Sequence, residues 1–233
     1  MADGAAPAIH ARGSRATSGR GRPPATRGRR SRRVRAYIGL GANLGDAAAT
    51  LASGIRALAA LPGVRLRGVS RLYATAPWGR PDQPEFRNAV VALDVPVAPD
   101  DRTAALDLMA ALKSLERTFG RAERVRWGPR ELDLDLLVFG RAGFSTERPA
   151  AARSTDPAKA GLPLTVPHPE ARHRLFVLAP LADLAPGLAP PGWGETVATA
   201  RRRQLQAEGR DAVRPVARWQ RGEWRPLLDV DST

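Results

Sequence analysis

Between Val34 and Gly140 the apolar residues change their spacing in an order that leaves few possible folds. Residues 34–41, 63–75, 86–95 and 131–140 are short, with alternating or continuous apolar residues, and are predicted strands. Helices are predicted from Asp46 to about Leu61 and from Asp100 or Asp101 to Phe119, where apolar residues recur every three or four positions. The order β-α-β-β-α-β predicts an α+β protein with a ferredoxin-like split βαβ core.

The segments outside this core predict a three-part chain. Residues 1–33 are rich in Arg, Gly, Ala, Ser and Pro and are predicted to be a disordered tail. The main domain is predicted to span 34–186, with a long surface loop at 141–163 and a turn and helix within 164–186. Residues 187–233 are predicted to be a C-terminal α/β extension that packs on or trails the domain, with a helix near 195–208 and a hairpin around Gln220–Gly222.

Net charge locates the basic character in the tail. The chain has a formal charge of +14, but residues 1–35 hold ten arginines and one acid. The tail could be an organelle transit peptide, a nucleic-acid-binding tail or an extension without function, and the last is favoured. It has no apolar segment typical of a secretory signal. The absence of Cys and of any apolar run of roughly 18 residues predicts a cytoplasmic protein that does not span a membrane.

Two aspartates alternate with leucines in the stretch RWGPRELDLDLLVFG, residues 126–140. Asp133 and Asp135 project from the same face of a strand, about 6–7 Å apart, and could hold one or two Mg²⁺ ions with substrate phosphates. A solvated strand face is the alternative. Upstream lie arginines with forked guanidinium groups suited to phosphate, although they could instead neutralise nearby acids. These are Arg121, Arg124, Arg126 and Arg130.

Three further motifs contain residues suited to ligand binding. GLGANLGD at 39–46 lacks the G-x-G-x-x-G spacing and the acidic residue of a dinucleotide fingerprint, so its glycines predict a tight turn near a ligand. Phe86 and Asn88 share a strand face and suit a flat heteroaromatic ligand, although core packing would also explain Phe86. His168 and His173 lack zinc spacing, and a His or Arg that donates to phosphate fits VPHPEARHRLF better.

Four segments in order, YIGLGANLGD, ATAPWGRPDQPEFRNAVVAL, GRAERVRWGPRELDLDLLVFG and LTVPHPEARHRLFVLAPL, resemble the 6-hydroxymethyl-7,8-dihydropterin pyrophosphokinases (HPPK) of folate biosynthesis. The resemblance runs from about Ala36 to Pro186. It implies an enzyme that transfers the β,γ-diphosphate of ATP, its co-substrate, to the hydroxymethyl group of the pterin and releases AMP. It also implies two Mg²⁺ ions between the aspartates and the ATP phosphates. We expect a monomer whose contact with nucleic acid is at most nonspecific, through the tail.

The same resemblance implies roles for particular residues. Asp133 and Asp135 would be metal ligands and, with Arg121 and Arg130, catalytic residues. The implied ATP-binding residues are Lys113, Glu116, Arg130, His168 and Arg174. The implied pterin-binding residues are Thr75, Phe86, Asn88, Trp127 and Phe176.

Three positions depart from the family pattern. Pro163 stands where an arginine precedes the LTVPH stretch, and Arg148 is a possible replacement. Glu123 replaces an arginine of the G-R-x-R loop, and Lys113 stands where a glutamine is common. Pro163 and Glu123 leave an inactive family member as one alternative to an active enzyme. A basic nucleic-acid-binding protein that uses the Arg-rich tail and the sheet face is the other.

Overall fold

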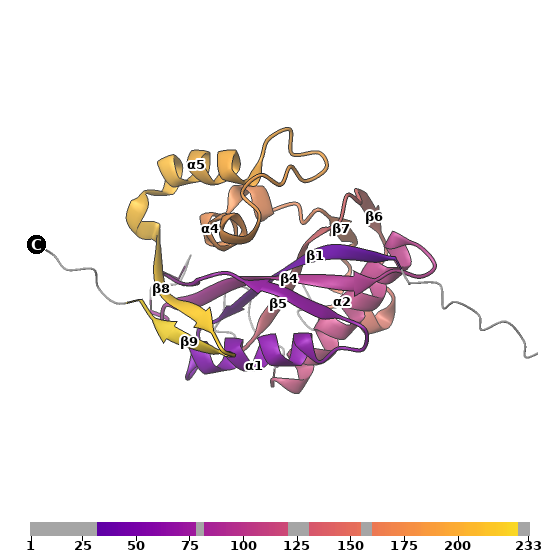
Figure 1. Cartoon of the computed structure of the whole chain (residues 1–233), viewed down its shortest axis with the longest axis horizontal. Helices are drawn as coiled ribbons and strands as arrows, with labels where there is room; N and C mark the ends of the chain where they lie inside the picture. The colour runs from indigo at the N-terminus through magenta and orange to yellow at the C-terminus, as the bar shows by residue number, and fades with distance from the viewer. Residues whose placement is uncertain (1–31, 78–81, 121–130, 155–159, 228–233) are drawn as a thin grey trace, which may run out of the picture. The chain divides into compact units, whose positions relative to one another are not determined.

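An antiparallel sheet forms the centre of the protein in the computed structural model, which describes residues 32–77, 82–120, 131–154 and 160–227. Its strand order is β5-β1-β4-β3-β8-β9, and β2 also pairs with β4 (Figure 1). The strands are β1 (Arg33–Ala42), β2 (Arg65–Val69), β3 (Leu72–Thr75), β4 (Phe86–Pro96), β5 (Asp133–Phe139), β8 (Val213–Gln220) and β9 (Glu223–Pro226).

The sheet topology confirms the predicted fold class. β1 and β3 both pair antiparallel with β4, so they run parallel to each other with β4 between them. α1 (Ala47–Ala59) follows β1, and α2 (Asp101–Thr118) connects β4 to β5. Together these elements form the split βαβ arrangement of a ferredoxin-like core.

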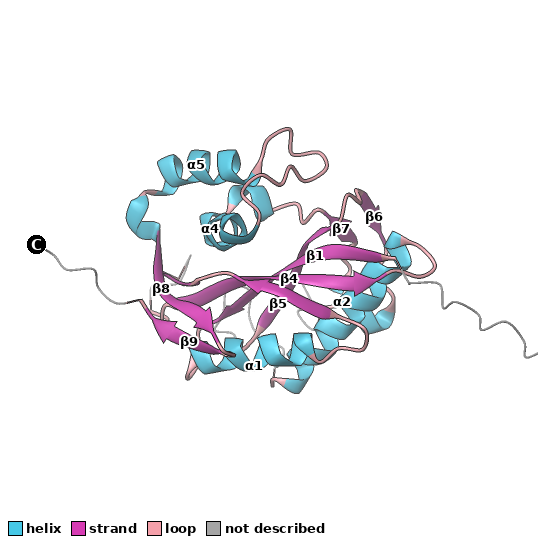
Figure 2. Ribbon diagram, in the orientation of Figure 1, coloured by secondary structure: helices cyan, strands magenta, loops and turns pink. Residues whose placement is uncertain are grey.

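Helices cover both faces of the sheet (Figure 2). α1 and α2 pack on one face, where Ile38, Leu93 and Leu134 are fully buried in the largest apolar cluster. α4 (Leu175–Leu184) packs on the other face, and α5 (Val197–Glu208) packs on α4. The predicted helix starts are correct, because Asp46 and Asp100 each accept a 2.9 Å hydrogen bond from the backbone N–H three residues later.

One predicted strand is divided in the structure. The prediction of a continuous strand over 63–75 is wrong, because Ser70 and Arg71 separate β2 from β3. The hydroxyl of Ser70 accepts a hydrogen bond from the backbone N–H of Val90 and donates one to the carbonyl of Arg71. The backbone N–H of Ser70 still donates to the carbonyl of Val90 at 2.9 Å, so at the break the Ser70 hydroxyl replaces only the acceptor for the Val90 N–H, and both halves pair with β4.

The described part of residues 141–163 contains regular structure that its composition did not predict. It includes β6 (Phe144–Thr146), which pairs with β7 (Leu164–Val166), and a 3₁₀ turn over Ala150–Ala152. Ala152 has no exposed surface and joins the main core. Further 3₁₀ turns lie at Ala171–His173 and Arg210–Ala212.

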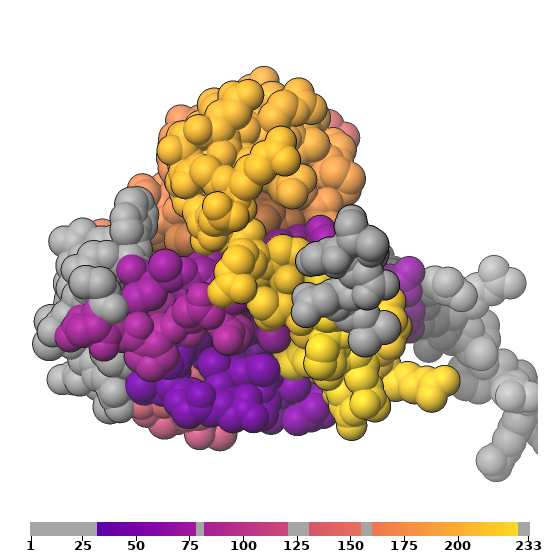
Figure 3. Space-filling model, turned by 90° about the vertical axis from the view of Figure 1, so that its left-hand side faces the viewer, coloured from indigo at the N-terminus to yellow at the C-terminus, as the bar shows by residue number. Residues whose placement is uncertain are grey.

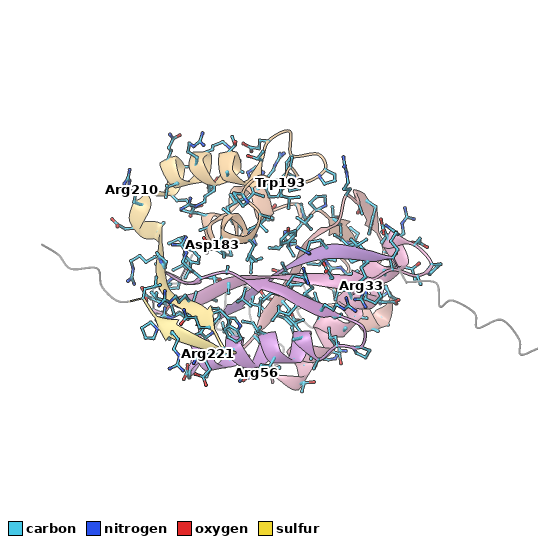
Figure 4. All side chains as sticks on the ribbon, in the orientation of Figure 1. Arg33, Arg56, Asp183, Trp193, Arg210 and Arg221 are labelled. Atoms are coloured by element: carbon cyan, nitrogen blue, oxygen red, sulfur yellow. The ribbon has the colours of Figure 1, made fainter. Side chains whose placement is uncertain are left out.

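The C-terminal strands extend the sheet. β8 pairs with β3, and β8 and β9 form the hairpin predicted around Gln220–Gly222, with positive φ at Arg221 and Gly222 as two-residue hairpin turns require. In Figure 3 this C-terminal hairpin lies beside the indigo and purple N-terminal elements. Arg56 of α1 donates to the carbonyl of Gly222, and its labelled side chain lies near that of Arg221 in Figure 4.

The ranges that the structure describes contain no helix long and apolar enough to cross a bilayer.

Candidate active site

The strand register places residues of three strands in one row. Gly41 of β1 lies opposite Asp133 of β5 on one side and opposite Asn88 of β4 on the other. Residues directly opposite each other project from the same face of a sheet. Neighbouring strands are about 4.8 Å apart, so the backbones of Asp133 and Asn88 are separated by about 10 Å. A carboxylate and an amide therefore share one face across a glycine.

A second row also places an aspartate beside a glycine, with a valine in place of the amide. Gly39 lies opposite Asp135 on one side and opposite Val90 on the other. A Cβ at Gly41 would lie 3.3 Å from Oδ1 of Asn88, and one at Gly39 would lie 3.4 Å from the side chain of Leu137. The two glycines thus leave the surface of β1 free of side chains beside both aspartates.

The alternation of β5 is as predicted. Asp133 and Asp135 are half-buried, whereas Leu132, Leu134 and Leu136 have no exposed surface. The described residues include no group of three or more His, Cys, Asp or Glu side chains that could hold a metal. A pair of carboxylates on a rigid strand fits Mg²⁺, which keeps several waters and takes further ligands from substrate phosphates.

Lys113 and Glu116 form a buried ion pair on α2, with 4% and 1% of their surfaces exposed. Nζ of Lys113 donates to Oε1 of Glu116 at 2.7 Å and to the carbonyl of Leu134 at 3.1 Å. The backbone N–H of Leu134 donates to the same Oε1 at 2.8 Å. Both side chains thus contact the backbone between the two aspartates.

Arg148 lies close to this group. Burial lowers the pKa of its guanidinium, and the negative charges of Asp135 and Glu116 act in the opposite direction. Thr146 pairs with Leu164, so Arg148 lies two residues beyond that pair. From the sequence, Arg148 was predicted only as a possible replacement for the family arginine that is missing at position 163. The long 141–163 segment separates Arg148 from the LTVPH motif, and the strand-favouring residues Phe144–Thr146 were the local signal for the hairpin.

The predicted pterin-binding residues on β3 and β4 are also brought together. Nδ2 of Asn88 donates a 2.9 Å hydrogen bond to Oγ1 of Thr75, and both residues are buried. Thr75 lies opposite Phe86, which shares the face of Asn88. Phe176, at the start of α4, packs against the cluster that contains Tyr73, the neighbour of Asn88 across the strands.

Residues 83–85, just before Phe86, are held by a hydrogen-bonding side chain after β1 and by an ion pair to β8. Nδ2 of Asn43, directly after β1, lies 3.3 Å from both Oε1 of Gln83 and the carbonyl of Pro84. Glu85 forms ion pairs with Arg214 of β8 and with Arg87. These arginines, Arg214 first, lower the pKa of the Glu85 carboxyl.

His168 and Arg174 flank the entry to α4. The backbone N–H of His168 donates to the carbonyl of Leu137, two residues after Asp135. Nδ1 of its ring accepts a hydrogen bond from the N–H of Glu170, whose carboxylate lies 3.7 Å from the guanidinium of Arg174. That guanidinium is 5.9 Å from the centre of the Phe176 ring. The predicted residues Arg121, Trp127 and Arg130 lie outside the described residues.

The family model and the relatives that match this chain all belong to one family. Residues 37–186 match the 7,8-dihydro-6-hydroxymethylpterin-pyrophosphokinase (HPPK) family. The chain is 42% identical over 167 residues to the 2-amino-4-hydroxy-6-hydroxymethyldihydropteridine pyrophosphokinase of Methylorubrum extorquens, covering 72% of this chain and 91% of the relative. It is 42% identical over 157 residues to the Pseudomonas aeruginosa protein of the same name, covering 67% and 84%.

The fold also resembles solved structures. The crystal structure of wild-type Plasmodium falciparum HPPK-DHPS with pteroate superposes with a TM-score of 0.62 at 13% identity. The match covers 84% of this chain and 48% of that one, so the chain spans about half the length of that protein. At this identity the likeness concerns the fold alone.

Proposed function

Because the chain belongs to the 7,8-dihydro-6-hydroxymethylpterin-pyrophosphokinase family, a family of ATP-dependent diphosphotransferases, we propose that it makes the pterin diphosphate of folate biosynthesis. The substrates are ATP and 6-hydroxymethyl-7,8-dihydropterin, and the products are AMP and the pterin diphosphate. The observation that carries this proposal is the row Asn88–Gly41–Asp133. In this row the amide proposed to bind the pterin and a carboxylate proposed to bind the metal share one face of the sheet.

The chemistry is a single displacement. The hydroxymethyl oxygen of the pterin forms a bond to the β-phosphorus of ATP, and the bond from that phosphorus to the α,β-bridging oxygen breaks. The bridging oxygen leaves on AMP, and the hydroxyl proton is released, with a site aspartate as the candidate acceptor. No covalent enzyme intermediate is needed, so positioning and charge neutralisation supply most of the rate.

The pterin end of the site follows from Thr75 and Asn88. An amide has both a donor and an acceptor, which matches the edge of a pterin ring. The hydrogen bond to Thr75 fixes the orientation of that amide. Phe86 and Phe176 are proposed to supply aromatic faces to the pterin ring, and Trp127 is proposed to cover it.

The phosphate end follows from the aspartates and the cations near them. Asp133 and Asp135 would hold Mg²⁺, proposed as two ions, which when bound neutralises phosphate charge. The charge of Asp135 acts on the guanidinium of Arg148, which is a candidate for binding a phosphate oxygen. His168 and Arg174 remain proposed ATP contacts, as do Lys113 and Glu116, and Arg121 and Arg130 are proposed to close on the phosphates.

The decisive experiment follows AMP formation from ATP with purified full-length protein. We expect AMP only when 6-hydroxymethyl-7,8-dihydropterin is present, with equimolar pterin diphosphate. An inactive family member would form no AMP with either substrate. Salt-sensitive RNA binding that depends on residues 1–33, without AMP formation, would instead favour the nucleic-acid alternative. The monomeric state and the cytoplasmic location stay predictions from the sequence.

A further inference from the structure

We propose that Lys113 and Glu116 are positioning residues that hold the backbone of Leu134 and thereby fix Asp133 and Asp135 for metal binding. The inference rests on the proposed function, because it assigns the aspartates to Mg²⁺. It adds an indirect role for two α2 residues, exerted through the strand between the two ligands.

β5 lies at an end of the sheet. β5 pairs with β1 on one side and is the last strand in the described order. The N–H and C=O of Leu134 are bonded to Glu116 and Lys113, so they point away from β1. The ion pair therefore occupies the place of a missing neighbouring strand, with Glu116 as acceptor and Lys113 as donor.

These hydrogen bonds also hold the two aspartates in place. The side chain of Leu134 has no exposed surface and is anchored in the core. Its backbone N–H and carbonyl are hydrogen-bonded to the buried side chains of Glu116 and Lys113, which also form a hydrogen bond with each other. Leu134 is thus fixed at its side chain and at both polar backbone groups. The Cα atoms of Asp133 and Asp135 are adjacent to it in the chain, so their separation and direction are fixed too.

The ion pair also balances charge close to the aspartates. Glu116 accepts a hydrogen bond from the backbone N–H of Leu134, the residue next to Asp135, so these two carboxylates lie near each other. Lys113 is bonded to Glu116 at 2.7 Å and neutralises it. A glutamine at position 113 could donate to the carbonyl of Leu134 but would leave Glu116 without this charge partner. Lysine serves both purposes, because its ammonium group has three donors and a positive charge.

A substitution at position 113 tests the positioning role, and amide exchange at Leu134 separates that role from a direct contact of Lys113 with ATP. Lys113→Met keeps the length and apolar stem but removes the donor and the charge. We expect amide hydrogen exchange at Leu134 to become about tenfold faster, and Mn²⁺ affinity with a non-hydrolysable ATP analogue to fall about tenfold, as for other groups that orient metal ligands. The KM for the pterin should stay within about twofold, because the residues at Asn88 are untouched.

Two further variants complete the test. Arg117→Met is the matched control, since Arg117 is an exposed residue of the same helix, and it should change neither exchange nor Mn²⁺ affinity. Glu116→Gln keeps an acceptor for the Leu134 N–H but removes the charge. It should weaken Mn²⁺ binding less than Lys113→Met does, and it serves in its place if that variant does not fold.

Three results would overturn the inference. Unchanged exchange at Leu134 would show that the pair does not hold this backbone. Faster exchange with unchanged Mn²⁺ affinity would show that the hold does not matter to the metal. Equally faster exchange at Leu93 in the sheet centre would show a general loss of stability. Failure of the proposed function is distinguishable, because wild-type protein would then form no AMP whatever the exchange and Mn²⁺ measurements give.

Discussion

The side-chain amide of Asn88 donates a 2.9 Å hydrogen bond to the hydroxyl of Thr75, and 6% and 8% of the two residues are exposed. The bond fixes which end of the amide faces β3. Thr75→Val keeps the shape but removes the acceptor, so we expect the KM for the pterin to rise about tenfold, the value of one buried hydrogen bond. Steady-state kinetics check this. Thr75→Ser should stay near wild type, and an unchanged KM in Thr75→Val would contradict the assigned role.

Gly41 lies between this amide and Asp133. In Gly41→Ala the new Cβ would lie 3.3 Å from Oδ1 of Asn88, so the amide must shift. We expect kcat/KM to fall by at least about tenfold, because misplaced groups in a site cost far more activity than stability. Gly187→Ala is the control, since a Cβ at that position meets nothing within 4 Å. Equal activities of the two variants would show that Gly41 need not be a glycine.

Asp135 has the role that most defines the proposed chemistry. Asp135→Ala removes one carboxylate from the pair on β5 while the leucines beside it stay buried. We expect kcat to fall on the order of 10³-fold or more, because without this carboxylate the Mg²⁺ that would neutralise the phosphate charge in the transition state is no longer held. The far-ultraviolet circular dichroism spectrum should not change. Near-normal turnover at saturating Mg²⁺ would rule out metal binding by this pair.

Arg148 tests whether the β6–β7 hairpin supplies a phosphate contact. Arg148→Met should raise the KM for ATP by about tenfold or more, because a partly buried guanidinium binds phosphate strongly, while the KM for the pterin stays similar. Arg141→Met replaces an exposed arginine of the preceding turn and should match wild type. If the two variants bind ATP equally well, Arg148 takes no part in the site.

The sequence predicted the parts of this fold that depend on local spacing. The caps at Asp46 and Asp100 and the alternation of Asp133 and Asp135 with leucines are properties of neighbouring residues, and the structure has them. The break at Ser70 could not be predicted, because it depends on a hydrogen bond to Val90 on another strand.

The site contacts that the sequence did not predict also depend on tertiary structure. That Gly41 lies between Asn88 and Asp133 depends on strand register, which is set by the whole sheet. Likewise, α2 must dock before Lys113 and Glu116 can reach Leu134. Residue types therefore indicated which side chains take part, whereas the contacts between them required the tertiary structure.

Asp183 connects α4 to the strand that carries Thr75, and its side chain is labelled in Figure 4. It accepts hydrogen bonds from the Tyr73 hydroxyl and from the backbone and guanidinium of Arg71. Burial, and then the charge of Asp183, raise the pKa of the Tyr73 hydroxyl. The folded state therefore keeps the phenol proton at a pH where the unfolded chain, with a tyrosine pKa of about 10, has lost it.

The sign of the resulting pH dependence follows. The contribution of Tyr73 to stability is fully present below about pH 10 and decreases as pH rises toward the folded pKa. Tyr73→Phe removes the hydrogen bond, so it should be less stable than wild type at pH 8, by about 1 kcal/mol. It also removes the titration, so the difference should shrink by pH 11. Urea unfolding at both values measures this, and a difference independent of pH would show that the two states share one Tyr73 pKa.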